Sequence, residues 1–416
     1  EWTPAAHAER GMAQVKGPVA TLRRMLAAPV LALAAGALVA IVSPGSLPAA
    51  LPLLALWLAS PLLAHLLGQP SRQRRETVAP DRRQDLRILA RRTWLFFERF
   101  VGPDDHWLPP DNFQEEPGGR VARRTSPTNM GLALLSTLGA HDLGYIGLLG
   151  LEARLRSTFD TLDRLERHRG HFYNWYETAR LAPLEPKYVS AVDSGNLVAC
   201  LWALATGCEE GPHTRVVRPS QREGLLDTLD VLQETLARPG SFGPGDTTRG
   251  PREKLASLRA RIDASREPRA FARLVADLHA RELVALEEYL AQLAERSVPG
   301  ADASALGDLR IWTARLRERV AHVHRELDTL APWLALREEL EDGAQGRAPR
   351  ADASLLRAAL AELPDAPLLA EVPAACAVAL LRVAHARASL ASHPTADPEA
   401  LAPCDRATTA LTRCAA

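Results

Sequence analysis

The sequence has no excess of charge of either sign. Its 416 residues include 50 basic and 50 acidic side chains, so the formal net charge at pH 7 is zero. A nucleic-acid partner calls for a basic surface, and this composition supplies no such overall field. No glycine-rich phosphate loop accompanies Arg123 and Arg124, and no cofactor motif is present in the chain. The sequence therefore argues against nucleic acid as a partner and predicts no cofactor within this chain.

Cysteine is also scarce. The chain has five cysteines, which form no CxxC pair and no Cys/His set with metal-ligand spacing: Cys200, Cys208, Cys376, Cys404 and Cys414. An odd, sparse count favours a reducing compartment, in which these residues are reduced thiols of a hydrophobic core. We therefore predict no metal site and no disulfide framework.

Charge is absent altogether between residues 25 and 64. A break at residues 43–48 (SPGSLP) divides this apolar stretch into two runs, residues 25–42 and 48–67, and each is about long enough to cross a bilayer as a helix. The break has room only for a tight turn, so the chain returns to the side that it left. We predict two transmembrane helices over residues 25–67, and a lipid bilayer as a partner.

Basic residues flank this predicted hairpin on both sides: Lys16, Arg23 and Arg24 before it, and Arg72, Arg74 and Arg75 after it. The positive-inside rule then places both flanks, and the soluble region that follows, in the cytoplasm. A secretory signal peptide would explain one apolar run but not a second of full length. A buried hairpin of a soluble domain is the other alternative.

The rest of the chain changes character twice. After a flank at residues 1–24 and the hairpin at 25–67, we predict a polar linker at 68–85. Residues 86–211 alternate helix-like apolar stretches, such as those starting at Leu86, near Ser126 and at residues 149–168, with polar and aromatic loops. Residues 212–416 are rich in Leu, Ala, Arg and Glu at helical period, which predicts an inserted accessory region of amphipathic helices. The expected fold class is all-α.

Four clusters in residues 86–211 combine aromatic, acidic and amide side chains. They are WLPPDNFQEE at 107–116, TSPTNMGL at 125–132, RGHFYNWYE at 169–177 and VDSGNL at 192–197. Aromatic faces cover the C–H faces of a sugar ring, while carboxylates and amides bond its hydroxyls. Paired helices whose connecting loops carry all of these residues at one end predict a carbohydrate-binding cleft on an α/α-toroid.

The candidate substrate-binding residues follow from these clusters. Aromatic candidates are expected to stack on sugar rings, and polar ones to bond hydroxyls: Trp107, Asp111, Asn112, Asn129, Tyr173, Asn174, Trp175, Tyr176, Asp193 and Asn196. Structural roles are the alternatives: Asp111 and Asn112 would cap a turn, Asp193 with Ser194 would cap a helix, and the aromatic residues would pack in a core. No acidic residue stands out as catalytic, and Glu115, Glu116 and Asp193 are the candidates.

These motifs, together with RRTWLFFERFV at 91–101, LEPKYVSAVDSGNL at 184–197 and the apolar LLALWLASPLLA at 53–64, closely resemble the central region of cyclic β-1,2-glucan synthases. The resemblance covers about residues 20–210. It implies a bacterial inner-membrane, multi-pass protein, with a glycosyltransferase part, a glycoamylase-like (α/α)₆ toroid and a phosphorylase-like part. The toroid of that family closes linear β-1,2-glucan into a ring as an anomer-retaining transglycosylase.

By this resemblance, the chain would be a fragment that carries the last transmembrane hairpin of the transferase part, the first part of the toroid and its insertion. Its first residue, Glu1, is not a methionine, which fits a piece of a longer protein. β-1,2-Glucan and the remaining domains of the same polypeptide would be its partners. UDP-glucose and a divalent metal are implied only for the absent transferase domain. The catalytic carboxylate pair of a retaining enzyme is expected in later helix-loop units, which leaves the isolated chain inactive.

Two alternatives remain open. In the first, the chain is a self-contained membrane-anchored β-glucan hydrolase that uses Glu115 or Glu116 with Asp193. In the second, the chain is a non-catalytic membrane scaffold whose aromatic loops only bind glycan. Loops 107–116 and 192–197 at opposite ends of the helices would favour the scaffold.

Overall fold

The computed structural model describes residues 21–23, 25–67, 78–116, 118–238, 249–288, 303–342, 351–392 and 398–415. The chain divides into two compact units, Glu1–Val78 and Ala79–Ala416. Among the described residues, the fold is all-α with a few two-residue strands, as the sequence predicts. The division after Val78 falls within the predicted linker, of which residues 68–77 lie outside the described residues. Most of the predicted flank at 1–24 lies outside them too.

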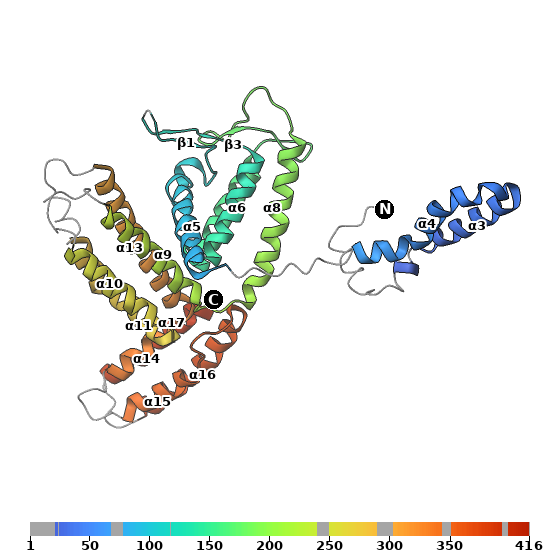
Figure 1. Cartoon of the computed structure of the whole chain (residues 1–416). Coiled ribbons are helices and arrows are strands. Elements are labelled where there is room, and N and C mark those ends of the chain that lie inside the picture. Colours follow the sequence, from blue (N-terminus) through green and yellow to red (C-terminus); the bar gives the residue numbers. More distant parts are fainter. Residues whose placement is uncertain are drawn as a thin grey trace. The chain divides into compact units, whose positions relative to one another are not determined.

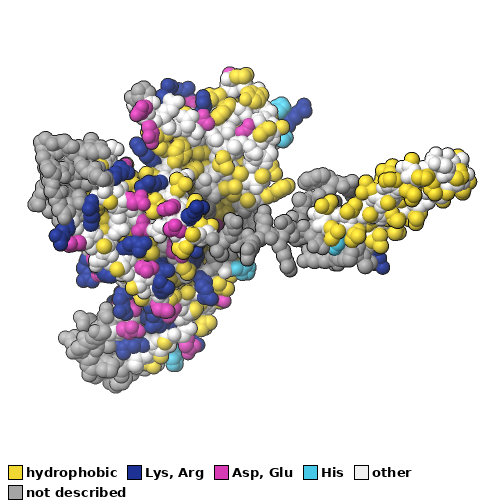
Figure 2. All heavy atoms as spheres, viewed as in Figure 1, with side chains coloured by type: hydrophobic (Ala, Val, Ile, Leu, Met, Phe, Trp, Pro, Cys, Tyr) yellow, Lys and Arg dark blue, Asp and Glu magenta, His cyan; other side chains and the backbone are white. Residues whose placement is uncertain are grey.

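The first unit is a helical hairpin. Its helices are α3 (Ala27–Val42) and α4 (Leu47–Leu67), joined by the short η1 (Pro44–Ser46) at the predicted break. Thr21 and His65 are in hydrogen-bond contact at 3.4 Å, so the two ends of the hairpin meet. Pro44–Leu67 is long and apolar enough to cross a membrane, and Ala27–Val42 is a shorter apolar helix. Hydrophobic side chains cover the hairpin surface in Figure 2, which is the surface that a bilayer requires.

The basic flanks used to orient this hairpin are largely outside the described residues. Lys16, Arg24, Arg72, Arg74 and Arg75 all fall there, and Arg23 alone is described. The orientation of the hairpin therefore rests on the sequence.

Two helical segments of the second unit, Ala191–His213 and Leu369–Ala391, also have the length and composition of a membrane span. The first comprises α8 (Ala191–Glu210) and η3 (Gly211–His213), and the second η5 (Leu369–Glu371) and α16 (Val372–Ala391). Each packs along one side against a neighbour, α8 on α6 (Pro127–Asp142) and α16 on α17 (Pro398–Ala415). We treat both as helices of the second unit, which they help to build.

Helices α5 (Pro80–Phe100), α6 and α8 run side by side, with α7 (Leu148–Arg164) against α6 (Figure 1). Helix α5 begins at Pro80, earlier than the predicted Leu86, because Pro80 occupies the first turn and Asp81 suits the positive end of the helix. Helix α6 begins where predicted. The Ser126 hydroxyl accepts from the backbone N–H of Asn129, and Pro127 follows Ser126 in the first turn. Helix α7 ends at Arg164, earlier than the predicted residue 168, because a hairpin begins at Arg167.

Short antiparallel strand pairs hold the loops at one end of these helices (Figure 1). β1 (Phe113–Gln114) pairs with β2 (Arg120–Val121), and β4 (Arg167–His168) with β5 (His171–Phe172). β3 (Arg124–Thr125) pairs with β6 (Tyr176–Glu177), which joins two of the predicted clusters directly. The turn η2 (Pro103–Asp105) precedes them.

Among the described residues, the predicted amphipathic region forms the remaining long helices of the second unit, with the short η4. They are α9 (Pro219–Ala237), α10 (Arg249–Ala264), α11 (Pro268–Asp277), the π-helical η4 (Leu278–Glu282), α13 (Ala303–Leu330), α14 (Trp333–Asp342), α15 (Ala351–Ala361), α16 and α17. Their apolar faces share one large core that includes Leu229, Leu232, Val320 and Trp333. Charged side chains of both signs are spread over the visible face of this region, as expected for solvated helical faces (Figure 2).

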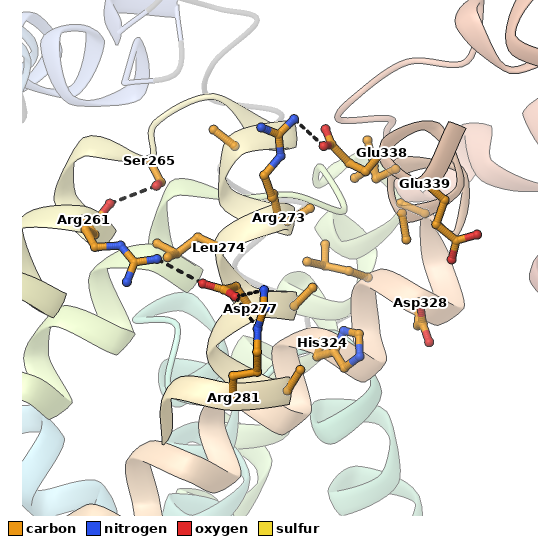
Figure 3. Close-up of a pocket in the computed structure, with 18 of the residues that line it drawn as sticks. Arg261, Ser265, Arg273, Leu274, Asp277, Arg281, His324, Asp328, Glu338 and Glu339 are labelled. Carbon is orange, nitrogen blue, oxygen red and sulfur yellow. Dashed lines mark hydrogen bonds and ion pairs between the residues drawn. The ribbon is translucent and has the colours of Figure 1, made fainter. Parts of the chain in front are cut away.

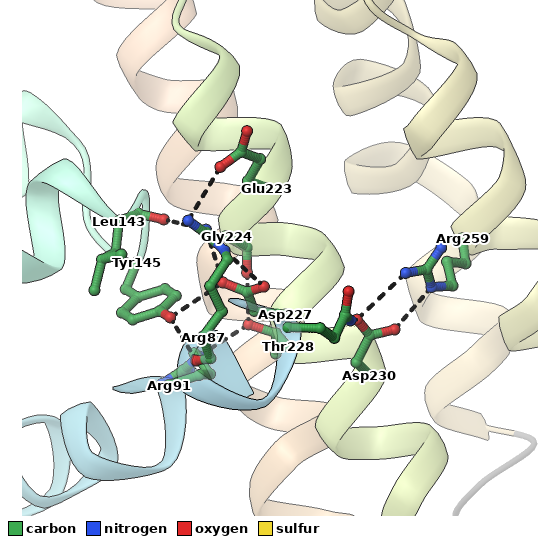
Figure 4. Close-up of polar contacts among 11 residues, drawn as sticks. Arg87, Arg91, Leu143, Tyr145, Glu223, Gly224, Asp227, Thr228, Asp230 and Arg259 are labelled. Atoms are coloured by element: carbon green, nitrogen blue, oxygen red, sulfur yellow. Dashed lines mark hydrogen bonds and ion pairs between the residues drawn. The ribbon is translucent and has the colours of Figure 1, made fainter. Parts of the chain in front are cut away.

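Buried ion pairs join α5 to α9 (Figure 4). The Arg87 guanidinium donates to Asp227 at 2.8 Å and to the carbonyl of Leu143 at 3.0 Å, and the Tyr145 hydroxyl donates to Asp227 at 3.1 Å. Burial raises the pKa of Asp227, and the Arg87 and Tyr145 contacts oppose that rise. Loss of one partner would leave the other charge buried, at a cost of about 3–5 kcal/mol.

The backbone of the α6–α7 loop touches that of α9. Gly144 has φ +82°, and a Cβ at that position would lie 1.7 Å from the carbonyl oxygen of Ser220. A Cβ on Gly224 would lie 2.1 Å from the carbonyl oxygen of Gly144. The two segments approach this closely only because neither residue has a side chain.

Gly224→Ala and Gly139→Ala should therefore change stability in opposite directions. Both glycines are helical, and a Cβ on Gly139 of α6 meets nothing within 4 Å. We expect Gly139→Ala to stabilise the unit by up to about 1 kcal/mol through helix propensity. We expect Gly224→Ala to destabilise it by about 1–3 kcal/mol, because the backbone of α9 must move away from Gly144. Thermal unfolding of the two purified variants measures both changes, and equal shifts would contradict the close contact.

Candidate functional site

The predicted clusters meet at one end of α6 and α8. Asn129 lies in the first turn of α6, and its side-chain amide donates to Asp111 Oδ1 at 3.3 Å. The Thr128 hydroxyl donates to Asp193 Oδ1 of α8 at 2.6 Å and accepts from the Asn196 amide at 3.1 Å. Loops 107–116 and 192–197 thus lie at the same end of the helices, so the arrangement that would favour the scaffold alternative is not observed.

Asn174 connects the third cluster to this network. It is 6% exposed. In the amide orientation that satisfies its neighbours, its nitrogen donates to Asp193 Oδ2 at 2.9 Å, and its oxygen accepts from Trp175 Nε1 and the Tyr188 hydroxyl, both at 2.6 Å. A side chain so deeply buried and fully bonded positions Asp193 and Trp175, whereas the sequence predicts that it contacts the ligand.

Arg124 completes the ring of contacts. Its guanidinium pairs with Asp111 at 3.0 Å and lies over the Trp175 ring, 5.1 Å from the centroid. Asp111, Asn129, Asp193 and Trp175 are all partly exposed. They therefore present carboxylate, amide and aromatic groups to solvent together, the mixture that sugar recognition uses.

Asp193 is held as an anion. Burial raises the pKa of its carboxyl, but hydrogen bonds from Ser190, Thr128 and Ser126 outweigh burial and leave the pKa below its ordinary value. An ionised carboxylate accepts hydrogen bonds and does not donate a proton at neutral pH, so Asp193 is suited to bind hydroxyls rather than to act as a general acid. The helix cap is Ser190, whose hydroxyl accepts from the Asp193 amide at 3.2 Å. The alternative in which Asp193 and Ser194 cap α8 is therefore wrong.

The aromatic candidates separate into two groups. Trp107 and Tyr173 are partly exposed, like Trp175. Tyr176 is 0% exposed, its hydroxyl donates to the Glu166 carbonyl at 2.6 Å, and it accepts from the Tyr173 amide at 2.7 Å. The expectation that Tyr176 stacks on a sugar conflicts with this burial, because a side chain of the hydrophobic core reaches no ligand.

Trp107 sits on an unusual stretch of backbone. Both His106 and Trp107 have positive φ, at 53° and 62°. The Trp107 ring lies under the Arg154 guanidinium, 5.5 Å from the centroid, and its carbonyl accepts from the Thr158 hydroxyl at 3.4 Å. These two contacts to α7 thus fix the orientation of Trp107, whose positive-φ backbone is energetically unfavourable.

Glu115 and Glu116 lie apart from the network. Both are exposed in the turn between β1 and β2, and the Glu115 carbonyl accepts from the Gly119 amide at 3.0 Å. Asn112 donates to Asp111 Oδ2 at 3.1 Å and so supports that carboxylate.

A neighbouring cluster was not anticipated from the sequence. Buried Asp105 accepts from Arg123 at 2.8 Å and from the Thr178 hydroxyl at 2.6 Å. These bonds tie η2 to the segments on either side of the β3–β6 pair, and so fix the loop that carries Trp107. The acidic turn at 104–105 and the paired arginines at 123–124 were the available signals.

A cavity of about 1030 Å³ lies elsewhere, among α10, α11, η4, α13 and α14 (Figure 3). Its charges largely neutralise one another: Arg261 and Arg281 both pair with Asp277, and Arg273 pairs with Glu338. The described residues include no group of three or more metal-ligating side chains, here or in the loop network.

Replacing Asp193 should change the pH dependence of stability. The folded-state pKa of Asp193 lies below its unfolded value of about 4, so its contribution is fully present above about pH 4 and is lost as the pH falls through the folded pKa. We expect Asp193→Asn to lower stability by about 1 kcal/mol at pH 7 and to flatten the fall in acid. Denaturant unfolding as a function of pH measures both. Asp160→Asn, at an exposed carboxylate of α7, is the control, and an identical acid profile for both variants would count against the network.

Comparison with known proteins supports the resemblance read from the sequence. No protein-family model matches the chain. Over 218 residues, 51% of its length, the chain is 40% identical to cyclic beta-(1,2)-glucan synthase NdvB of Rhizobium meliloti. The matched part amounts to 8% of that much longer relative. The match confirms the predicted resemblance: about half of this chain is similar to a segment of a cyclic β-1,2-glucan synthase.

Proposed function

We propose that this chain is a segment of a membrane-bound cyclic β-1,2-glucan synthase, and that the loops at the end of α6 and α8 bind glucan for the ring-closing transglycosylation. The single observation that carries the proposal is the network of Asp111, Asn129, Asp193 and Trp175. It unites all four sequence clusters on one surface. The similarity to NdvB supplies the glucan as the ligand to test.

The partly or fully exposed members of the network take the ligand-facing roles. Asp111, Asn129, Asp193 and Asn196 bond glucosyl hydroxyls, with the carboxylates as acceptors and the amides as both donors and acceptors. Trp107, Tyr173 and Trp175 stack on the C–H faces of the rings. Arg124 holds Asp111 and Trp175 in place between them.

Bond exchange is assigned to other parts of the same polypeptide. A retaining transglycosylase needs two carboxyl groups about 5–5.5 Å apart, one as nucleophile and one as acid and base. Asp193 is stabilised as an anion within a hydrogen-bond network, and Glu115 and Glu116 stand on an exposed turn. We therefore propose that the catalytic pair, and the UDP-glucose and divalent metal of chain synthesis, belong to domains that this sequence does not include.

Helix α8 offers a surface for those domains. Its side away from α6 exposes Val192, Val198 and Trp202, with exposed fractions of 72%, 45% and 59%. Large exposed apolar side chains on one side of a helix are typical of a packing interface. We propose that further helices of the toroid cover this face.

Replacing Trp175 tests the glucan-binding proposal. The purified chain in detergent should bind linear β-1,2-glucan oligosaccharides, and Trp175→Ala should weaken binding about tenfold by removing the stacking surface. Isothermal titration calorimetry measures the affinity. Trp202→Ala removes a similar exposed ring outside the network and should leave the affinity unchanged.

Two results would contradict this assignment. If the Trp175→Ala variant binds glucan as tightly as the wild type, the loops do not form the glucan site. Release of reducing sugar by the purified chain alone, abolished by Glu115→Gln, would favour the self-contained hydrolase instead.

The proposed location is the bacterial inner membrane, with the second unit in the cytoplasm. In cells with a permeabilised outer membrane, a membrane-impermeant maleimide should label Ser46→Cys, at the turn of the hairpin. The exposed native Cys208 should react only after lysis. Labelling of Cys208 in unlysed cells would reverse the orientation.

A further inference from the structure

Two histidine rings meet beside the cavity of Figure 3. His279 belongs to η4 and His324 to α13, and their ring centroids lie 4.6 Å apart with 44° between the ring planes. His324 lines the cavity, as does Asp328, one turn further along α13 (Figure 3). Because residues four apart lie on the same face of a helix, the Asp328 carboxylate is a neighbour of the imidazole pair.

These three side chains differ from the other polar groups of the cavity. The remaining charged side chains that line it are engaged in ion pairs: Asp277 with Arg261 and Arg281, Glu338 with Arg273, and Glu339 with Arg406. By contrast, His279, His324 and Asp328 have no hydrogen-bond or ion-pair partner among the described residues. Their lone pairs are therefore free to bind a ligand.

The spacing of the two rings suits a shared metal ion. Neutral imidazole is a preferred ligand of divalent transition metals. Burial lowers the pKa of His324, and the Asp328 carboxylate opposes that change. With metal–nitrogen bonds of about 2.0–2.1 Å, two imidazoles on one ion have ring centroids about 4.5–5.2 Å apart. The observed 4.6 Å lies in this range, so only the orientation of the rings has to adjust.

His279 is carried by an unusual turn of backbone. Residues Leu278–Glu282 form a π-helix, η4, which directly continues α11 and packs against α13. π-Helical turns are rare, and they are found frequently at functional sites. The turn thus holds one imidazole against a second helix that supplies the other.

We propose that His279 and His324 together bind one divalent transition-metal ion of the zinc type at the edge of this cavity. The two imidazoles supply nitrogen ligands, and water from the cavity fills further positions. In this conformation the described residues form no group of three metal-ligating side chains, so Asp328 reaches the ion through a water or after its side chain rotates. The bound ion fastens the π-helical turn to α13.

Zinc titration of the purified 416-residue chain, after removal of metal with a chelator, tests the site. Calorimetry with zinc chloride should show one ion bound with micromolar affinity, and the unfolding temperature should rise by about 2 °C or more. His279→Gln and His324→Gln should each weaken binding at least about tenfold, because each removes one of the two imidazoles.

Two controls accompany this titration. His322→Gln, at an exposed position two residues from His324 and on another face of α13, should bind zinc as the wild type does. Magnesium chloride should not replace zinc, because Mg²⁺ prefers oxygen ligands. Zinc binding of equal strength in wild type and His324→Gln would assign the ion to other residues and overturn the proposal.

Crystals of the chain soaked in zinc chloride give a second readout that needs no variant. An anomalous peak about 2.1 Å from a nitrogen of each ring would establish the site even if His324→Gln fails to fold. An anomalous peak only at other residues, or rings packed against each other with no ion between them, would refute it.

Discussion

The second unit depends on the buried contact between α5 and α9. Arg87 and Asp227 meet inside the protein with Tyr145 hydrogen-bonded to the same carboxylate, and Gln84 and Arg259 both bind Asp230 one turn further along α9. Burying these charges is tolerable only while every partner is present. The backbone contact between Gly144 and Gly224 fixes the spacing at the same interface. The helices that carry the loop network are thereby fixed to the amphipathic region, which is an integral part of the second unit.

The loop network is built on a different principle. Its strands are only two residues long, so their ladders contribute little rigidity, and side chains take over that role. Asp105 binds residues on both sides of the β3–β6 pair, and Asn174 and Thr128 together hold both oxygens of Asp193. The surface carboxylates and rings are therefore positioned in advance, so that ordering them adds little entropic cost when a ligand binds.

Local signals in the sequence predicted local structure well. The cap at Ser126 and Pro127, the apolar hairpin with its break, and the mixed aromatic and acidic loops are all encoded within a few residues. The burial of the Tyr176 and Asn174 side chains was not predicted, because the mixed polar and aromatic segment RGHFYNWYE does not indicate which of its side chains point into the core. The partners of Arg87, Asp105 and Glu326 lie far along the chain and leave no periodic trace. Ser190 was overlooked as a cap because Asp193 and Ser194 offer the same chemistry nearby.

The cap of α7 has a consequence for the order of folding. The Leu148 amide donates to Glu326, which lies 178 residues further along the chain. Arg87 pairs with Asp227, which lies 140 residues further along. During synthesis, the loop-bearing helices emerge long before the residues that neutralise and cap them. Contacts this distant in sequence slow folding, and the half-built unit exposes apolar surface until α13 is complete. The amphipathic region thus completes the folding unit last, and a chain cut between α8 and α13 would lose the order of the loop network along with the helices removed.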